Sequence, residues 1–591
     1  MQEYFGVSFP KGWQPLMCHL FLFRFGNVLL ADPTWRPVGW PDKNPQPYTG
    51  EGRFQHAKTI SEKLLTHDFD WHHWSEDAVE AFSTQEWAAI TGCGASGKST
   101  AAALYANLFY LSAPAKSGVI ILSTTIDAAK RRIWREALRL HSALVKACGA
   151  NVFGSSTINS PRPSIRCDAK DTVHAICVVA VGKGQEEEGI SILKGFHPKR
   201  LLIICDELDS IQQSVVDVCR INLQTGTEEF QFIGLGNPTS RFDPHGKLCE
   251  PAQGWDFLDN ECEEWTSKSG AKVLRFDGYK SPRISDGDNS WKGLIRQSDI
   301  DNITRLYGAD SKYFWTMVRG LWAPDGTDNS IIPESLFIKF HARDKVTWRD
   351  SFTRCSSTDP AFGGDRCVWR RFDYGFDTSH KIKVFFHPPV IIPIHQNDAS
   401  NPAEYQIAAA IRKLNDLNEI APANTILDST GTGRGVTSVL QREYSQAILT
   451  CDFGGSASSL PVSDTNRKPA NHEYDRKISE LLFSFAEFVK ADMVRGIDDD
   501  TCIEFATRTF ELKGSGQGKR FSVETKSDFK ARGNRSPDLM DASAMAVDLL
   551  RRRHIAPTFA DSPTKLRHDN WSDLVRHFDL DNSKRTYQEA F

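Results

Sequence analysis

Apolar and polar positions alternate along two long stretches of the chain in the manner of an α/β protein. In the first stretch, from about residue 55 to 240, short apolar runs are separated by segments with a helical period; the runs are 87–91, 119–123, 175–181, 201–205 and 230–235. Strands that alternate with helices indicate a parallel sheet with flanking helices. A second stretch of this kind begins near Arg354 and ends near Arg553. The pattern therefore predicts two α/β domains.

Three irregular or polar segments delimit these domains. Residues 1–50 are rich in Pro, Trp and Phe and have no clear period, so we expect an irregular N-terminal arm. The stretch 323–330 reads Ala-Pro-Asp-Gly-Thr-Asp-Asn-Ser, which is typical of a linker. The polar segment 554–591 predicts a flexible C-terminal tail. The predicted domains are thus 51–335, which includes a lid or linker region, and 350–553.

Composition excludes several classes of protein. With 591 residues, the chain is too long for a single hydrophobic core. Its 71 basic and 75 acidic residues give a formal charge of −4, so any DNA contact must come from local basic surfaces. The 13 cysteines never form a C-x-x-C pair, which argues against a zinc ribbon and fits a reducing cytosol. The apolar run 16–31 is interrupted by polar residues and is too short for a membrane span, and the acidic run 186–188 is interpreted as a solvated loop.

A glycine-rich motif follows the first apolar run. Residues 92–99 read Gly-Cys-Gly-Ala-Ser-Gly-Lys-Ser, which fits G-x-x-x-x-G-K-[ST], and a strong helix start comes next. Strand, glycine loop and helix are the context of a P-loop, in which backbone N–H groups and the lysine bind phosphates. The serine hydroxyl would bind Mg²⁺. The residues predicted to bind ATP here are Gly92, Gly94, Ser96, Gly97, Lys98, Ser99 and Thr100.

Two further strand ends complete this candidate nucleotide site. The apolar run 201–205 leads into Asp206 and Glu207. The carboxyl end of a parallel strand lies at the edge of the sheet where the phosphates of a bound nucleotide are found. Asp206 is predicted to hold Mg²⁺, and Glu207 to orient and activate the attacking water. The run 230–235 leads into Gly-Asn-Pro-Thr, where Asn237 is predicted to sense the γ-phosphate.

Acidic residues in the second domain occur where strands end or a helix begins. Asp359 and Asp365 lie in the string 356–365, which a β-rich run, 367–372, follows, and Asp428 ends an apolar string. Asp538 and Asp541 are three residues apart at the start of a helical pattern, so they share a helix face. Clustered carboxylates suit a pair of Mg²⁺ or Mn²⁺ ions, which promote phosphodiester cleavage. The pattern predicts a metal-dependent nuclease.

The combination resembles the large terminase subunit of tailed bacteriophages over about residues 50 to 550. Besides the strings above, Lys194-Gly195 and the stretch 318–322, Val-Arg-Gly-Leu-Trp, are similar to that family. The resemblance implies an additional-strand, catalytic-glutamate (ASCE) ATPase domain and an RNase H-like nuclease domain. It implies that ATP hydrolysis drives double-stranded DNA into a procapsid and that the nuclease cuts concatemeric genomes. Partners would be the portal and a small terminase subunit, and the expected location is the host cytoplasm, without a membrane.

Two points of the resemblance leave assignments open. Many family members carry an Arg inside the P-loop, whereas the variable positions here include Cys93, Gly94 and Ala95. An arginine finger must then come from elsewhere; Arg131 and Arg132 are candidates, with a role as surface charges as the alternative. The third nuclease acid is Asp538 or Asp541, with Asp538 preferred, and Asp365 matches a secondary acid. A ring on the portal and a monomer in solution are both compatible with the sequence.

Two other functions use some of the same residues. A helicase–nuclease would combine the same two chemistries, but further helicase strings are not seen between Gly236 and the nuclease acids. A nucleotide-switched assembly protein without catalysis would not need Lys98, Ser99 and Glu207 together. Packaging mode and cut-site specificity are not encoded in any motif that we recognise.

Overall fold

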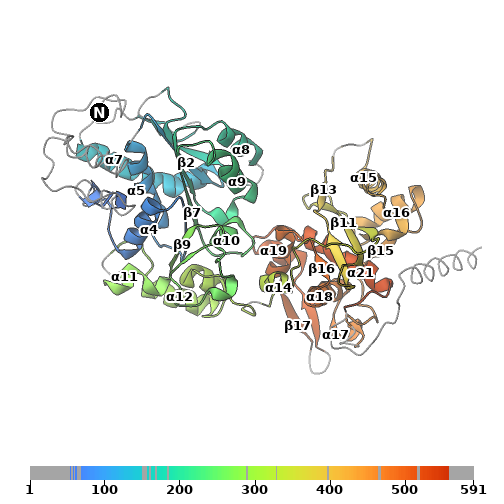
Figure 1. Ribbon diagram of the computed structural model, residues 1–591. Helices are drawn as coiled ribbons and strands as arrows, with labels where there is room; N and C mark the ends of the chain where they lie inside the picture. The colour runs from blue at the N-terminus through green and yellow to red at the C-terminus, as the bar shows by residue number, and fades with distance from the viewer. Residues whose placement is uncertain are drawn as a thin grey trace, which may run out of the picture. The chain divides into compact units, whose positions relative to one another are not determined.

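The computed structural model describes residues 53–557 with short gaps. The gaps are 55–56, 59, 63–64, 66–67, 113, 149–155, 159–161, 167–169, 183–185, 288–290, 328, 396–397, 399, 464–467 and 515–518. The predicted N-terminal arm, 1–50, and most of the predicted tail, 558–591, lie outside the described residues. The chain divides into two compact units, 1–329 and 330–591, and the division falls inside the turn-rich stretch 323–330 (Figure 1).

The first unit is built on a nine-stranded sheet whose centre is parallel. In spatial order the strands are β3 (Ser156–Ile158), β4 (Ser164–Arg166), β5 (Ala175–Ala180), β2 (Ser117–Ser123), β6 (Arg200–Cys205), β7 (Glu229–Gly236), β1 (Trp87–Gly92), β9 (Lys272–Phe276) and β8 (Glu264–Thr266). The predicted parallel sheet is confirmed. Strand β7 lies between β1, which leads into the glycine loop, and β6, which leads into Asp206. This inserted strand is the additional strand of the ASCE type.

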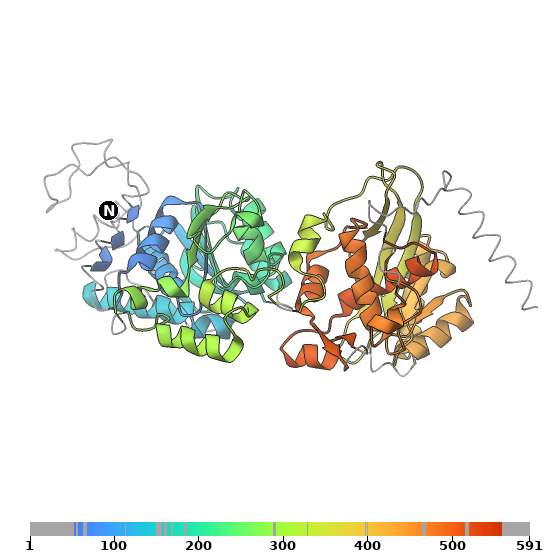
Figure 2. The ribbon, with the colours of Figure 1, turned by 90° about the horizontal axis from the view of Figure 1, so that it is seen from below.

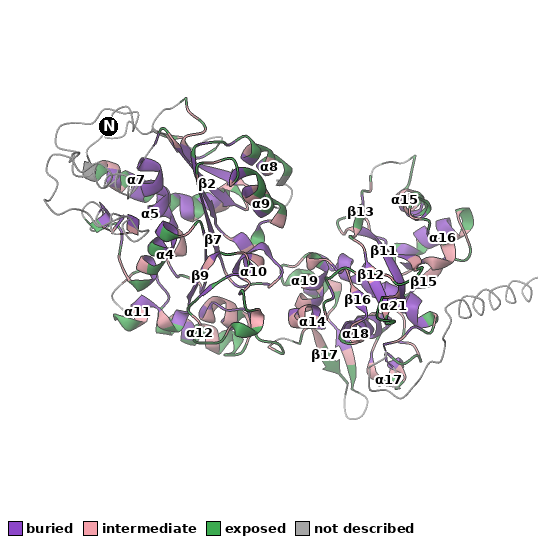
Figure 3. Cartoon of the chain, in the orientation of Figure 1, coloured by how far each residue is buried: buried purple, intermediate pink, exposed green. Residues whose placement is uncertain are grey.

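Helices cover both faces of this sheet (Figures 1 and 2). Alternate strand residues face opposite cores: on β6, Leu202 and Ile204 belong to one, and Leu201 and Ile203 to the other. The first core includes α4 (His73–Thr84), α5 (Lys98–Leu111), α6 (Ile126–Arg131) and α7 (Ile133–Cys148). The second includes α8 (Glu186–Lys194), α9 (Gln213–Val218) and α10 (Pro244–Cys249). Because both faces are covered, the central strands β1, β2 and β6 are buried along their whole length (Figure 3).

One local prediction in this unit is wrong. The acidic run 186–188, interpreted as a loop, forms the first turn of α8. Acidic side chains are favourable at a helix N-terminus because they interact with the positive end of the helix dipole, so the run is a helix-start signal. Glu187 and Glu188 are exposed to solvent, as expected.

A mostly helical stretch completes the first unit and returns to the glycine loop. Its elements are α11 (Pro282–Ser285), α12 (Gln297–Tyr307), α13 (Lys312–Phe314) and the π-helical turn Trp315–Arg319. Within the stretch, the carbonyl of Met317 accepts a hydrogen bond from Gly94 N–H at 2.9 Å. Ile295 N–H donates to the carbonyl of Ala95 at 2.9 Å. The stretch therefore supports the loop that the first half of the unit provides.

The second unit contains a seven-stranded sheet with a mixed strand pattern. Strands β10 (Thr353–Asp359), β11 (Cys367–Phe376) and β12 (Ile382–Phe386) form an antiparallel meander, and β13 (Val390–Ile392) pairs with β11. On the other side of β10 lie β14 (Thr425–Asp428) and β15 (Leu449–Cys451), both parallel to it. The short strand β16 (Val494–Arg495) pairs with β12. The order β12-β11-β10-β14-β15 with these directions is the RNase H-like arrangement.

Helices also cover both faces of the second sheet. Helices α15 (Ala403–Leu417) and α16 (Gly433–Glu443) share a core with β11 and β14 on one face. Helix α21 (Asp538–Arg552) contacts β10, β11 and β14, and α18 (Lys477–Lys490) and α19 (Asp499–Thr507) contact α21. The smaller elements are α14 (Glu334–Lys339), α17 (Ala470–Glu473), α20 (Lys526–Ala531) and a hairpin of β17 (Phe510–Lys513) and β18 (Arg520–Val523). Among the described residues of the whole chain, no helix is long and apolar enough to cross a membrane.

Two candidate catalytic sites

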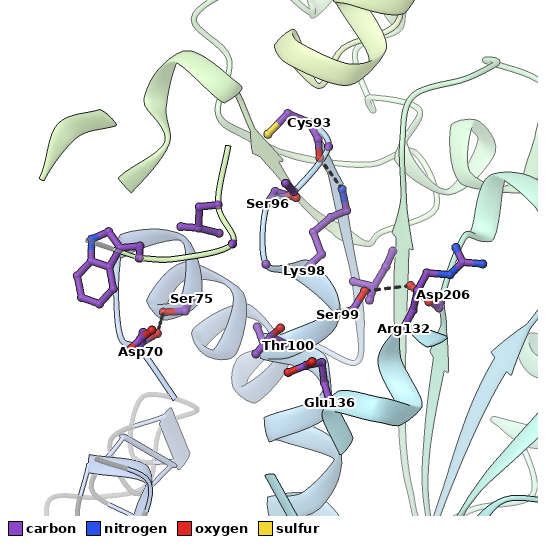
Figure 4. Close-up of a pocket in the computed structure, with 18 of the residues that line it drawn as sticks. Asp70, Ser75, Cys93, Ser96, Lys98, Ser99, Thr100, Arg132, Glu136 and Asp206 are labelled. Atoms are coloured by element: carbon purple, nitrogen blue, oxygen red, sulfur yellow. Dashed lines mark hydrogen bonds between the residues drawn. The ribbon is translucent and has the colours of Figure 1, made fainter. Parts of the chain in front are cut away.

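The glycine loop of the first unit lies between the end of β1 and the start of α5 (Figure 4). Gly97 precedes α5 with φ of +75°, a left-handed conformation that favours glycine. A Cβ atom on Gly94 would lie 2.8 Å from Met317 Cε, so the end of the Met317 side chain would have to move. Helix α5 begins without a side-chain cap. Its first N–H groups can therefore bind an anion.

The side chain of Lys98 folds back toward the start of the glycine loop. Its Nζ donates to the carbonyl oxygens of Gly92 at 3.3 Å and Cys93 at 3.1 Å. Desolvation lowers the pKa of Lys98, while Asp206 and Asp209 act in the opposite direction. The ammonium is thus held by weak neutral acceptors, which an anionic phosphate can replace.

The predicted magnesium ligands of this site lie side by side. Ser99 Oγ donates to Asp206 Oδ1 at 3.2 Å, although the two residues are far apart in the sequence (Figure 4). Asp206 is only 5% exposed, and its Oδ2 is buried without a hydrogen-bond partner among the described residues. Burial raises the pKa of Asp206, opposed by Arg132, Ser99 and Lys98. A hydroxyl beside an unsatisfied carboxylate oxygen fits a hard cation such as Mg²⁺.

Glu207 occupies a strained turn directly after Asp206. Its φ is +58°, in the left-handed region that costs a non-glycine residue roughly 1–2 kcal/mol. The carboxylate pairs with the guanidinium of Arg132, which lies at the C-terminal end of α6. A strained backbone conformation persists only where the surrounding structure holds it in place, and such residues are often found at functional positions. Of the two predicted arginine-finger candidates, Arg131 is exposed and Arg132 is already paired within the chain.

The third predicted element connects β7 to the loop. Asn237 Nδ2 donates to the carbonyl of Gly92 at 3.0 Å. Asp209, which the sequence analysis did not single out, accepts hydrogen bonds from the backbone of Asn237 and, at 3.4 Å, from Thr239 Oγ1. Burial raises the pKa of Asp209. In the sequence, Asp209 could have been singled out because it follows Asp206 by three residues, directly after the end of β6. Asp209 links that exit to the exit of β7.

The glycine loop, Lys98, Ser99, Asp206, Glu207 and Asn237 line a cavity of about 740 Å³, a size suited to a nucleotide. Its wall also includes His72 and Trp291, whose rings lie 5.5 Å apart, and a row of arginines on α6 and α7. Burial lowers the pKa of His72 to about 4. Sequence analysis missed His72 and Trp291 because each comes from a segment without a motif.

The second site lies at one edge of the second sheet. Asp359 and Asp428 are the last residues of the neighbouring parallel strands β10 and β14, and they are 3% and 9% exposed. Asp538 and Asp541 are in the first turn of α21 and are fully buried. Because α21 packs across β10 and β14, its first turn comes to the same edge. The structure therefore brings together four of the five predicted acids.

The side chain of Lys526 joins three of these acids. Its Nζ lies 2.9 Å from Asp541 Oδ2, 3.1 Å from Asp359 Oδ2 and 3.5 Å from Asp538 Oδ1. Burial lowers the pKa of Lys526, but the three carboxylates outweigh it and raise that pKa above its ordinary value. Burial also raises the pKa of Asp359, where Lys526 opposes the shift and the other carboxylates add to it. We call Asp359, Asp428, Asp538 and Asp541 the acid cluster.

Other hydrogen bonds fix the individual members of the acid cluster. Asp428 accepts from Thr430 N–H at 2.9 Å and from its hydroxyl at 2.6 Å. Asp538 accepts from Ser536 Oγ at 2.6 Å. Asp541 pairs with the buried guanidinium of Arg508 at 2.9 Å. Neither Arg508 nor Lys526 belongs to a recognisable motif, so the sequence analysis missed both.

Asp365, the fifth predicted acid, has a different environment. It is partly exposed and pairs with Lys530 Nζ at 2.9 Å. Lys530 is on the same short helix, α20, as Lys526. The two lysines of one helix thus pair with two different sets of acids.

The donor atoms of the acid cluster suit a divalent cation, but their arrangement includes an ammonium group. Carboxylate oxygens are the ligands that Mg²⁺ and Mn²⁺ prefer. Across the described residues, however, no three His, Cys, Asp or Glu side chains are grouped as a metal site. In the acid cluster, Lys526 supplies the positive charge. The residues thus fit a metal by their chemistry, whereas the side-chain positions fit the lysine.

Comparisons with known proteins find similar solved structures but no matching family. No family model and no curated protein matches the chain. Among solved structures, a large terminase from a thermophilic bacteriophage matches with 12% identity over 81% of this chain and 99% of that chain, at a TM-score of 0.33. The HK97 bacteriophage large terminase matches with 11% identity over 81% and 95%, at a TM-score of 0.34. The large terminase nuclease of the thermophilic phage G20c matches with 14% identity over 37% and 98%, at a TM-score of 0.24. At identities and TM-scores this low, function has to be argued from the two sites themselves.

Proposed function

We propose that the chain is the motor subunit of a viral DNA-packaging machine, with an ATPase site in the first unit and a DNA-cutting site in the second. The observation that supports this most strongly is the presence, in one chain, of a P-loop facing Asp206 and Glu207 and of the acid cluster on an RNase H-like sheet. ATP hydrolysis would move double-stranded DNA into a procapsid. The nuclease would cut concatemeric DNA at the start and end of packaging.

In the proposed ATPase site, the loop backbone and Lys98 bind the phosphates of ATP. Ser99 and Asp206 would hold Mg²⁺, which neutralises phosphate charge when bound. Glu207 accepts a proton from the attacking water once it leaves Arg132, and Arg132 can then turn toward the phosphates. Asn237, bonded to the carbonyl of Gly92, relays loss of the γ-phosphate to β7.

In the proposed nuclease site, Asp359, Asp428 and Asp538 are the main ligands, with Asp541 beside them. A pair of Mg²⁺ or Mn²⁺ ions held there would stabilise the attacking and leaving oxygens of a phosphodiester. Thr430 and Ser536 orient the carboxylates of Asp428 and Asp538 through the hydrogen bonds given above. Carboxylates that bind metal are commonly held in this way by hydrogen bonds from their neighbours.

The partners of such a motor follow from the proposed activity. It would dock on the portal of the procapsid as a homo-oligomeric ring, receive DNA from a small terminase subunit, and work in the host cytoplasm. In such a ring, Arg131, which is exposed at the wall of the nucleotide cavity, could reach the nucleotide site of a neighbouring subunit.

The nuclease half is tested by plasmid cleavage with Mg²⁺ or Mn²⁺. Wild-type protein should relax and linearise the plasmid, and Asp428→Ala should not, with ATP hydrolysis unchanged as the internal control. Undiminished cutting by Asp428→Ala would remove the acid cluster from the proposed function.

The motor half is tested by protection of DNA from an added nuclease in the presence of purified procapsids, portal and ATP. We expect ATP-dependent protection with wild-type protein and none with Glu207→Gln. ATP-driven separation of a forked duplex, without protection in procapsids, would instead favour a helicase–nuclease.

A further inference from the structure

The ammonium of Lys526 lies where a cation is needed by the acid cluster. It contacts carboxylates from two separate elements, β10 and α21, at 2.9–3.5 Å. The three carboxylates are 4% exposed or less, whereas the Lys526 side chain is 35% exposed. Lys526 is therefore the solvent-facing member of a group whose anionic members are buried.

The remaining positive charges near the cluster have other partners. Arg508 pairs with the second oxygen of Asp541, and its Nε donates to the carbonyl of Glu524 at 3.0 Å. Arg366 pairs with Glu504 at 2.6 Å and reaches Asp538 with its Nε at 3.5 Å. Among the described residues, Lys526 is the cation that contacts both Asp359 and α21. Without it, buried carboxylates would repel one another at short range.

The helix that carries Lys526 is held by other residues, so the Lys526 side chain can move without unfolding the site. Lys526 is the first residue of α20, which is capped by Thr525 through its hydroxyl and anchored by the buried ring of Phe529. The four methylene groups of a lysine rotate freely, so the ammonium can leave while α20 stays in place. Arg508, by contrast, is held at 3% exposure.

We propose that Lys526 is a built-in counter-ion that occupies the metal position of the acid cluster and is displaced when a divalent cation binds. The inference rests on the metal-dependent cutting proposed above. In the protein without divalent cations, Lys526 keeps the carboxylates together. When a cation binds, the ammonium moves toward solvent, so the two compete for the same oxygens.

If Lys526 and the cation compete for the same oxygens, removing the lysine charge should strengthen cation binding. A lysine with a purely structural role would not have this effect. Replacing Lys526 by Met keeps the chain length and removes the charge. In EDTA, Lys526→Met should unfold at a lower temperature than wild type. On titration with Mn²⁺ it should regain stability, and its half-maximal Mn²⁺ concentration should be about tenfold lower than that of wild type.

Lys530→Met is the matched control. It lies on the same helix and also loses an ion pair with an acid, but its partner Asp365 is outside the acid cluster. Its half-maximal Mn²⁺ concentration should equal that of wild type. Mn²⁺ binding in the first unit affects all variants equally and cancels. Equal Mn²⁺ concentrations for Lys526→Met and Lys530→Met would overturn the proposal.

A second measurement uses the unmodified chain and so does not depend on a variant that folds. Lysine acylation with an amine-reactive ester, followed by mass spectrometry, reports the accessibility of each ammonium. Addition of Mn²⁺ should speed the labelling of Lys526 several-fold and leave Lys530 unchanged. Labelling of Lys526 that does not respond to Mn²⁺ would contradict displacement.

The failure of this inference differs from the failure of the proposed function. If Mn²⁺ stabilises wild type but not Asp428→Ala, and Lys526→Met behaves as Lys530→Met does, the metal site stands and only displacement fails. If Mn²⁺ affects neither stability nor labelling in any variant, and the plasmid stays intact, both ideas fail.

Discussion

The two candidate sites place acidic residues at the ends of parallel strands, but they are held together by different means. In the first unit the backbone supplies most of the site: a left-handed Gly97, an uncapped helix start, and one hydroxyl–carboxylate contact of 3.2 Å. In the second unit, side chains from β10, β14 and α21 converge and are balanced by Lys526. A backbone site can form without its ligand, whereas buried carboxylates repel one another unless a cation or a proton offsets their charge.

The largest expected effect is on the first site. Glu207→Gln removes the proposed base without changing the side-chain shape, so ATP turnover should fall about 10³-fold while ATP binding persists. Phosphate release and nucleotide binding are the two readouts, with Glu228→Gln, at an exposed glutamate that pairs with Lys199, as the control. Normal hydrolysis by Glu207→Gln would assign the base elsewhere.

The matching change in the second site is Asp359→Asn. It should reduce plasmid cleavage at least about a hundredfold, because a metal ligand contributes several kcal/mol of charge stabilisation. ATP hydrolysis should stay at the wild-type rate. Asp365→Asn, at the partly exposed acid that pairs with Lys530, should have a much smaller effect on cleavage; an equal loss in both variants would place Asp365 inside the cutting site.

One buried group in each unit should change stability with pH, and the two groups should act in opposite directions. Burial raises the pKa of Glu504 to about 7, so its contribution to the stability of the second unit is present below pH 4.5 and lost as the pH rises through 7. Burial lowers the pKa of His141 to about 4, so its contribution to the stability of the first unit is present above pH 6.5 and lost as the pH falls toward 4. Each effect is worth roughly 3 kcal/mol. Hydrogen exchange in α19 and α7, corrected for intrinsic rates, measures the pH dependence of stability in each unit separately.

Variants sharpen the pH comparison. Glu504→Gln should flatten the pH dependence of exchange in α19 between pH 5 and 7.5, and His141→Gln should do the same in α7 between pH 4 and 6.5. A slope that each variant leaves unchanged would show that another group controls it.

The smallest effect concerns the backbone of the glycine loop. Gly97→Ala puts a Cβ at a φ of +75° and 3.2 Å from Leu294 Cδ2, so we expect a loss of about 1–2 kcal/mol in stability and weaker ATP binding. Thermal unfolding and binding of a fluorescent ATP analogue measure both. Gly195→Ala is the control, since a Cβ there would meet ordinary contacts at 3.5 Å and normal backbone. Equal behaviour of the two variants would mean that the loop is not held as described.

The contrast between the sites also explains what the sequence could predict. The P-loop, Asp206, Glu207 and Asn237 were found because short contiguous strings encode a backbone shape and its side chains. The acids of the second site were found as three separate strings, because the ends of strands and helices leave a local pattern. Their convergence depends on the strand order, which the sequence pattern alone does not specify.

Residues that act only through tertiary contacts left no such pattern. Lys526 and Arg508 are ordinary basic residues in the sequence, and only packing of their segments beside α21 brings them to the acids. Asp209 was passed over beside the stronger Asp206-Glu207 pair. The start of α8 was mistaken for a loop because an acidic run fits either structure and only the apolar residues that follow distinguish them.

The most direct test of two separate metal sites is the position of bound Mn²⁺ in crystals of the whole chain, located by anomalous X-ray scattering. We expect Mn²⁺ among the carboxylates of the acid cluster at the edge of the second sheet, with Lys526 Nζ moved away from them. Mn²⁺ found only beside Ser99 and Asp206, with Lys526 still among the acids, would contradict the second site.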